Sequence, residues 1–153
     1  MEQLERKIPP VAVFIVMVVI INYLSRCIHL ADLPLPLPGV VFGLCFLLAG
    51  GIGIAGVYEF RKADTTVNPV TVDKATSVVD SGIFSYTRNP MYLALFLLLF
   101  GYAYWHQNLL GLVISFGFIV YMNRFQIQPE EQALERLFGE EYLDYKQRVR
   151  RWI

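Results

Sequence analysis

Charged residues are scarce in this sequence of 153 residues. Asp, Glu, Lys and Arg together make up 17% of the chain, whereas average soluble proteins contain about 25%. Thirteen basic residues balance thirteen acidic ones, so the chain lacks the excess of Lys and Arg with which dedicated nucleic-acid binders neutralise phosphates. The composition therefore indicates a membrane protein, and we expect no nucleic-acid partner.

Cysteine and histidine are sparse as well. The two cysteines, Cys27 and Cys45, cannot build a disulfide framework. Together with His29 and His106 they are scattered singly through apolar sequence, so the four-ligand set of a structural zinc site is missing. We expect no metal site. The length fits one domain, which would cover residues 1–153.

The few charges that are present are distributed unevenly. Residues 33–58 contain none, and neither do residues 89–123. The second run would form a helix of about 52 Å, whereas the core of a bilayer is only ~30 Å thick. The run must therefore fold back, at the polar triplet of residues 106–108. The pattern predicts an all-α integral membrane protein with four transmembrane helices, at about residues 11–28, 39–58, 90–105 and 109–126.

The basic residues predict the orientation, because Lys and Arg are retained on the cytoplasmic side. With both termini cytoplasmic, Arg26 alone among the thirteen basic residues falls on the outer side. The polar segments 59–89 and 127–153 are then cytoplasmic too. The N-terminus also resembles a signal peptide, but Arg26 stands where cleavage needs small residues. Pro9 and Pro10 instead suit the first turn of a retained helix.

Glycines are concentrated in the second predicted span. Residues 51–56 match the GxGxxG dinucleotide pattern, with Asp73 at the position of a ribose-binding acid. That motif requires a βαβ unit, and here it lies inside an uncharged apolar run. The better interpretation is a helical face of small residues on which a helix packs closely. The partner is an internal helix or a second copy in a homo-oligomer, and this face consists of Gly43, Gly50, Gly53 and Gly56.

Two helix starts adjoin the polar segments. Pro90 begins the third span with Asn89 as its N-cap, and the N–H groups of such a start can bind a carboxylate or phosphate; the alternative is simply a capped membrane helix. Pro129 opens a C-terminal amphipathic cytoplasmic helix, which we expect to lie along the membrane surface. Gly139 can break this helix in two. Three arginines near its end suit the anionic headgroups of membrane lipids, and these are Arg148, Arg150 and Arg151.

Two blocks in these segments resemble one protein family. Residues 82–92 (GIFSYTRNPMY), followed by Glu130-Glu131 and residues 138–142 (FGEEY), are similar to the isoprenylcysteine carboxyl methyltransferase and phospholipid methyltransferase superfamily of integral membrane enzymes. The resemblance covers residues 65–152. It implies a methyltransferase that uses S-adenosylmethionine and acts at the membrane on a lipidic or small hydrophobic acceptor. The alternative is a non-catalytic membrane subunit that retains the fold.

The resemblance also implies where the cofactor binds, in a cytoplasmic pocket closed by the C-terminal helix. Glu130 suits the ammonium of S-adenosylmethionine, and the helix start at Asn89 suits its carboxylate. Glu131, about 100° around the helix, is expected to face elsewhere, toward Arg88 or Arg124. Carried over residue by residue, the cofactor contacts fall on Thr76, Ser77, Val78, Val79, Phe84, Asn89, Pro90, Met91, Tyr92 and Glu130.

The chain departs from the family pattern at three positions. Asn89 replaces a His, and Phe84 stands where Tyr is common; both residue types can still contact the cofactor. The Arg that orients the substrate in the family is Gln126 here, one helical turn before Glu130. Arg124 is the candidate catalytic residue for orienting the acceptor, and the choice between Arg124 and Gln126 stays open. A prenylated carboxylate acceptor is correspondingly less well supported.

Overall fold

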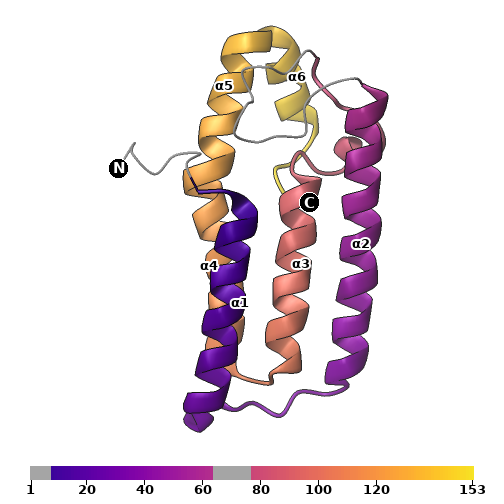
Figure 1. Ribbon diagram of the computed structural model, residues 1–153. Helices are drawn as coiled ribbons and strands as arrows, with labels where there is room; N and C mark the ends of the chain where they lie inside the picture. The colour runs from indigo at the N-terminus through magenta and orange to yellow at the C-terminus, as the bar shows by residue number, and fades with distance from the viewer. Residues whose placement is uncertain (1–7, 64–76) are drawn as a thin grey trace.

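The computed structural model describes residues 8–63 and 77–153, and its regular elements are helices (Figure 1). Four apolar helices form a bundle: α1 (Pro10–Cys27), α2 (Pro38–Lys62), α3 (Pro90–Trp105) and α4 (Leu109–Met122). A π-helical turn, Asn123–Ile127, joins α4 to α5 (Gln128–Phe138), and α6 (Glu140–Arg148) follows. Short 3₁₀ helices occur at His29–Ala31 and Gly82–Ser85.

Local sequence signals set the beginnings of these helices. A proline in the first turn opens α1, α2 and α3, where its missing N–H is harmless and its φ is already helical. α4 begins at the buried Asn108, whose Oδ1 accepts from the backbone N–H groups of Leu110 and Gly111 at 3.1 and 3.3 Å. The Asn108 Nδ2 donates to Asp32 in the other connection at this end. The predicted turn between α3 and α4 is thus confirmed.

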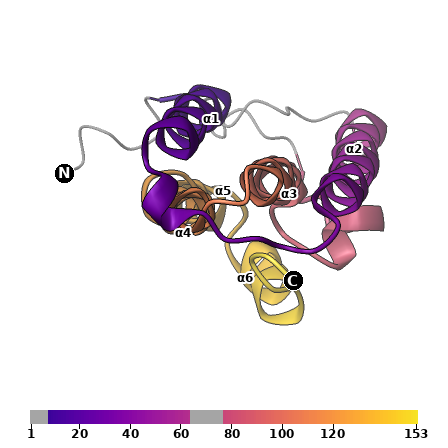
Figure 2. The same ribbon diagram turned by 90° about the horizontal axis from the view of Figure 1, so that it is seen from below.

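α3 lies in the middle of the bundle, between α2 on one side and α1 and α4 on the other (Figure 2). A Cβ added at Gly101 of α3 would lie 2.7 Å from the Cβ of Cys45, so glycine allows the close approach of α2. Gly53 also faces α3, but no described atom lies within 4 Å of a Cβ built at Gly43 or Gly50. The predicted single glycine face is therefore split, and its role in a homo-oligomer stays a prediction.

The outer surface of the bundle is apolar. Within the described residues, three helices are long and apolar enough to cross a membrane, and α3 is a shorter apolar helix. Only 17% of the most apolar stretch of α2 is buried inside the protein, so side chains such as Leu47 and Ile54 face outward. Outward-facing apolar side chains reverse the pattern of a soluble bundle and suit lipid. This is the arrangement of a multi-pass integral membrane protein, with candidate spans at Pro10–Cys27, Pro38–Lys62 and Leu109–Phe138.

The C-terminal part differs from the sequence prediction. The chain is helical without interruption from Leu109 to Phe138, and α5 extends α4 rather than forming a separate helix along the membrane surface (Figure 1). The π-helical turn ends two residues before Pro129, whose missing N–H would leave an α-helical carbonyl without its partner. The predicted break at Gly139 is confirmed, because this residue has a φ of 55° and separates α5 from α6.

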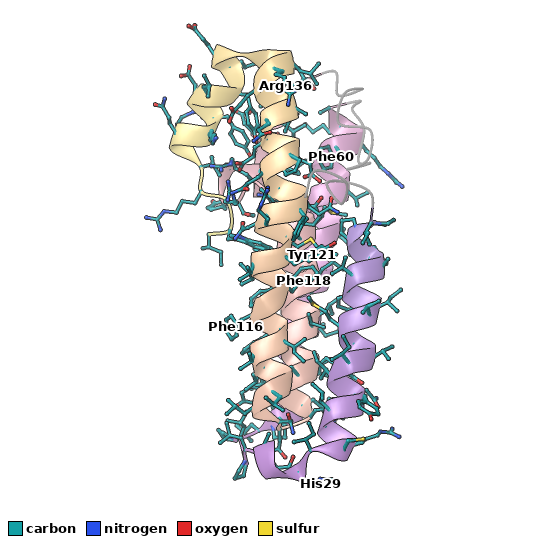
Figure 3. All side chains as sticks on the ribbon, turned by 90° about the vertical axis from the view of Figure 1, so that its left-hand side faces the viewer. His29, Phe60, Phe116, Phe118, Tyr121 and Arg136 are labelled. Carbon is teal, nitrogen blue, oxygen red and sulfur yellow. The ribbon has the colours of Figure 1, made fainter. Side chains whose placement is uncertain are left out.

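The two ends of the bundle are distinct. Figure 3 shows Phe60 and Arg136 toward one end and His29 at the other. α6 folds back at the former end, and the chain then returns to the start of α3 (Figure 1). We call this end of the bundle the site end.

Candidate active site

A cavity of about 460 Å³ lies at the site end, among α2, α3, α5, α6 and residues 77–84. Thr76 lies outside the described residues. Every other residue predicted to contact the cofactor lines this one cavity: Ser77, Val78, Val79, Phe84, Asn89, Pro90, Met91, Tyr92 and Glu130. The fold thus brings together three separate segments that sequence reasoning had assigned to one ligand.

The first of these segments is anchored by a residue that sequence reasoning missed. Glu59, near the end of α2, is 8% exposed and accepts a hydrogen bond of 2.5 Å from the Ser81 hydroxyl. Gly82 follows with a φ of 56°, and a Cβ at this position would clash with the Glu59 carboxylate. The 3₁₀ helix Gly82–Ser85 then presents the buried Phe84 to the cavity, where its ring packs edge-on against Phe60 at 4.9 Å.

α6 supplies two buried tyrosines to the cavity lining, and they pack in one cluster with Phe84. Tyr142 and Tyr145 are each 4% exposed, and the Tyr145 hydroxyl donates to the carbonyl of Phe84 at 2.8 Å. Burial raises the pKa of both hydroxyls, and the Glu131 carboxylate raises that of Tyr142 further. Both tyrosines therefore stay neutral, and the Tyr145 hydrogen bond ties α6 to the Phe84 segment.

Tyr92 and Glu130 form the polar contact between α3 and α5. Each lies in the first turn of its helix, and the Tyr92 hydroxyl donates to Glu130 Oε1 at 2.5 Å. The Tyr92 residue is 6% exposed. Both residues line the cavity, so the hydrogen bond fixes the direction of one carboxylate within it. Sequence reasoning assigned both residues to the cofactor but did not pair them.

Glu131 is the centre of a buried ion-pair cluster. Its carboxylate accepts from Arg88 Nη2 at 2.6 Å and from Arg151 Nη2 and Nε at 2.6 and 3.1 Å. The hydrogen bond to Glu131 raises the pKa of Arg151. Of the two arginines toward which Glu131 was expected to face, Arg88 binds its carboxylate. The second partner, Arg151, was not predicted. Glu131 lines the same cavity as Glu130, although its oxygens are taken by the two arginines.

The chain after α6, residues 149–152, lies across the start of α3, and we call it the C-terminal strap. Arg88 Nη1 donates to the Val149 carbonyl at 2.5 Å, and Asn89 Nδ2 donates to the Arg151 carbonyl at 2.9 Å. Asn89 occupies the N-cap position of α3 as predicted, but its side chain makes no cap hydrogen bond. The expected capping interaction is replaced by this contact to the strap.

Two buried polar atoms in the cavity lining have no hydrogen-bond partner among the described residues. They are the Nε of Arg88 and the hydroxyl of Ser77. Buried polar groups are nearly always paired, so each such exception calls for an explanation. A ligand that carries acceptor oxygens would satisfy both groups.

The candidates for orienting the acceptor lie apart from the cavity lining. Arg124 is exposed, with its guanidinium carbon 5.8 Å from the centre of the Phe125 ring. Gln126 is 1% exposed and donates from Nε2 to the Ile8 carbonyl at 2.6 Å. Neither is among the residues that line the cavity, and the role of Arg124 stays a prediction.

The cavity continues along the bundle between α1, α2 and α3 as an apolar extension. Small residues, Ala49, Gly53 and Ala94, line it together with Leu95 and Leu98. One end of the cavity is therefore polar and aromatic, and the other is apolar. This combination suits a ligand with a charged head beside an apolar group.

A cavity lined by charged side chains within an apolar helix bundle is typical of a membrane-embedded enzyme or binding protein. The family model for phospholipid methyltransferases matches residues 39–141 of the chain. The chain belongs to this family, within the superfamily that also includes the isoprenylcysteine methyltransferases.

Curated relatives agree with this assignment. The chain is 31% identical over 121 residues to the protein-S-isoprenylcysteine O-methyltransferase of Mus musculus, covering 72% of this chain and 37% of that protein. It is 31% identical over 114 residues to the Xenopus laevis enzyme of the same name, covering 72% and 35%. The chain thus spans little more than a third of these enzymes. An uncharacterized protein of Haemophilus influenzae is 48% identical over 63 residues, 41% of this chain and all of that protein. No solved structure matches the chain.

Proposed function

We propose that this chain is an S-adenosylmethionine-dependent methyltransferase that acts at the membrane on a lipidic or small hydrophobic acceptor. Residues 1–153 form one methyltransferase domain. The observation that carries the proposal is the gathering of the predicted cofactor residues around one cavity in a member of this family. The names of the relatives, which are methyltransferases, support the reaction type.

The residues of the cavity fit the donor chemically. Glu130, oriented by Tyr92, is an acceptor for the ammonium of an amino acid, and the start of α3 favours a carboxylate. Phe84, Phe60 and Tyr142 provide aromatic surface for an adenine ring or a sulfonium. The unpaired donors of Arg88 and Ser77 are complementary to carboxylate or ribose oxygens. When bound, S-adenosylmethionine supplies a methyl group on a positively charged sulfur.

The acceptor would occupy the apolar extension of the cavity. Gly53 and Ala94 line this extension, and a reactive head on an apolar group held there would then meet the donor at the polar end. Alignment of the acceptor, methyl and sulfur can supply most of the rate, so no general base is needed for a thiolate or carboxylate. Arg88 is the one cation among the described lining residues.

The proposed topology has four spans with both termini in the cytoplasm. α3 is shorter than the other three spans, about 24 Å at 1.5 Å per residue, but its central place in the bundle suits a fourth span. The site end then faces the cytoplasm, since Arg61, Lys62, Arg136 and the three arginines near the C-terminus are located there.

Equilibrium binding of S-adenosylmethionine to the purified protein in detergent tests the proposal. An enzyme of this kind should bind the donor measurably, and its Glu130→Gln variant should bind it about tenfold or more weakly. The absence of binding by a folded wild-type protein would instead indicate a non-catalytic subunit that retains the fold. For a protein that binds the donor, methyl transfer to prenylcysteines, phosphatidylethanolamine and small thiols would then identify the acceptor class.

A further inference from the structure

A second, shallower hollow lies on the outer surface of α2, and we call it the α2 groove. Its volume is about 430 Å³, and its described lining consists of Gly53, Ile54, Val57, Tyr58, Arg61 and Met91. The five residues from α2 follow the spacing of one helical face. Ile54 is 74% exposed and Tyr58 is 63% exposed. The groove therefore opens away from the bundle.

The α2 groove is distinct from the cavity of the candidate active site. Gly53 and Met91 line both spaces, which therefore adjoin each other at the contact between α2 and α3. This contact is close, because a Cβ at Gly56 would lie 3.2 Å from the Met91 Sδ. α2 lies at the edge of the bundle (Figure 2). An occupant of the groove would thus lie on the outside of the protein, in the lipid.

The position of the groove along α2 matches one leaflet of a bilayer. α2 has 25 residues and is about 37 Å long, whereas the hydrocarbon core is ~30 Å thick. With the midpoint of α2 at the bilayer centre, Arg61 lies about 16 Å from that centre, at the level of the headgroups. Tyr58 lies about 12 Å from it, near the interface that tyrosines favour. Gly53, Ile54 and Val57 then face the acyl chains.

The charge of the groove indicates which headgroup it suits. Arg61 is exposed and is the only charged residue in the described lining. The nearest acid along α2, Glu59, is buried and bonded to Ser81. A guanidinium binds phosphate oxygens through parallel hydrogen bonds. The ammonium of a zwitterionic headgroup would meet no acid in this lining, so a headgroup with a net negative charge is more complementary to it.

We propose that the α2 groove binds one anionic glycerophospholipid, with the phosphate on Arg61 and an acyl chain along Gly53, Ile54 and Val57. Tyr58, three residues before Arg61, offers a hydroxyl donor on the same face of the helix. The cation and the apolar face are each complementary to one part of the same lipid. The site requires neither the donor nor the reaction proposed above, so either proposal can fail without the other.

Quenching by brominated phospholipids tests this site in reconstituted bilayers, because bromine on an acyl chain quenches a tryptophan that it contacts. Ile54→Trp places a reporter in the groove, in a background where both native tryptophans are replaced by Phe. Leu47→Trp is the matched control. Leu47 is 70% exposed on the same helix, two turns from Ile54, and both lie within about 6 Å of the helix midpoint.

The bilayers consist of phosphatidylethanolamine with one part in ten of brominated phosphatidylglycerol. A tenfold preference, as for other charge-assisted contacts, raises occupancy of the groove from about one tenth to about one half. Quenching at position 54 should therefore be several times that at position 47. Arg61→Gln should remove this excess. Lys62→Gln alters the neighbouring cation, which is not part of the lining, and should keep it.

Three results would overturn the inference. They are an excess that survives Arg61→Gln, an equal excess at positions 47 and 54, and an equal excess when the phosphatidylethanolamine is brominated instead. The comparisons between positions and between lipids keep Arg61 intact, so they remain decisive if Arg61→Gln does not fold. Quenching at position 54 below that at position 47 would also refute it, since a second copy of the chain would then cover the groove.

Discussion

Replacing Glu131 by Gln tests whether the ion-pair cluster holds the site end together. The Glu131 side chain is 6% exposed and meets two guanidinium groups at 2.6 Å each. Gln keeps the size and one acceptor oxygen but removes the charge, so Arg88 and Arg151 lose the carboxylate between them. Breaking a buried pair from one side costs about 3 to 5 kcal/mol. We expect a loss of unfolding free energy of about 3 kcal/mol, because Arg151 is 28% exposed and Gln still accepts one bond.

Thermal unfolding in detergent measures this loss, which corresponds to a fall in Tm of about 6 to 12 °C for a chain of this size. The control is Glu130→Gln, which removes a carboxylate from the same turn of α5 but leaves the arginine cluster intact. It should lower Tm little and weaken donor binding about tenfold or more. Equal losses of stability and of affinity in the two variants would refute the reasoning, since the two acids would then have no separate roles.

Three further predictions concern the neighbouring residues and the topology. Tyr92→Phe removes the hydrogen bond to Glu130 and should cost about 0.5 to 1.5 kcal/mol of donor affinity, measured by titration. Tyr92→Ala should cost more, and an unchanged affinity of the folded Tyr92→Ala variant would show that Tyr92 is not part of the site. Gly82→Ala should weaken donor binding more than Gly139→Ala, because both glycines have φ near 55° but only Gly82 adjoins Glu59; equal effects would argue against that anchor. A reporter fused after Ile153 should be cytoplasmic and one inserted at residue 107 external; signals from the same side would contradict four spans.

The helix boundaries were predictable because the signals that set them are local. The predicted spans coincide with α1 to α4 to within a few residues, and the prolines at positions 10, 38 and 90 mark where three of these helices start. Asn108 caps α4 with its own side chain. None of these features depends on residues distant in sequence, so patterning and turn chemistry were enough.

The pairings inside the site were not predictable in the same way. Tyr92 and Glu130 are 38 positions apart, and Ser81 and Glu59 are 22 apart, so no local spacing connects them. The direction of α5 depended on how the helix accommodates Pro129, and the π-helical turn before it leaves no sequence signature. Most of the residues that line the polar end of the cavity could be predicted from family motifs, whereas the hydrogen bonds among them could be seen only in the folded structure.

The position of Gln126 bears on the acceptor. Its buried side chain binds the Ile8 carbonyl, so the residue that would orient a carboxylate in the family instead fastens the chain before α1 to the π-helical turn. An arginine at this buried place would need a counter-charge that a carbonyl does not supply. Among the described lining residues, Arg88 is the only cation, and its Nη1 and Nη2 already donate to the Lys146 and Val149 carbonyls and to Glu131. In the proposed reaction, the described lining therefore offers a carboxylate acceptor no orienting cation other than Arg88.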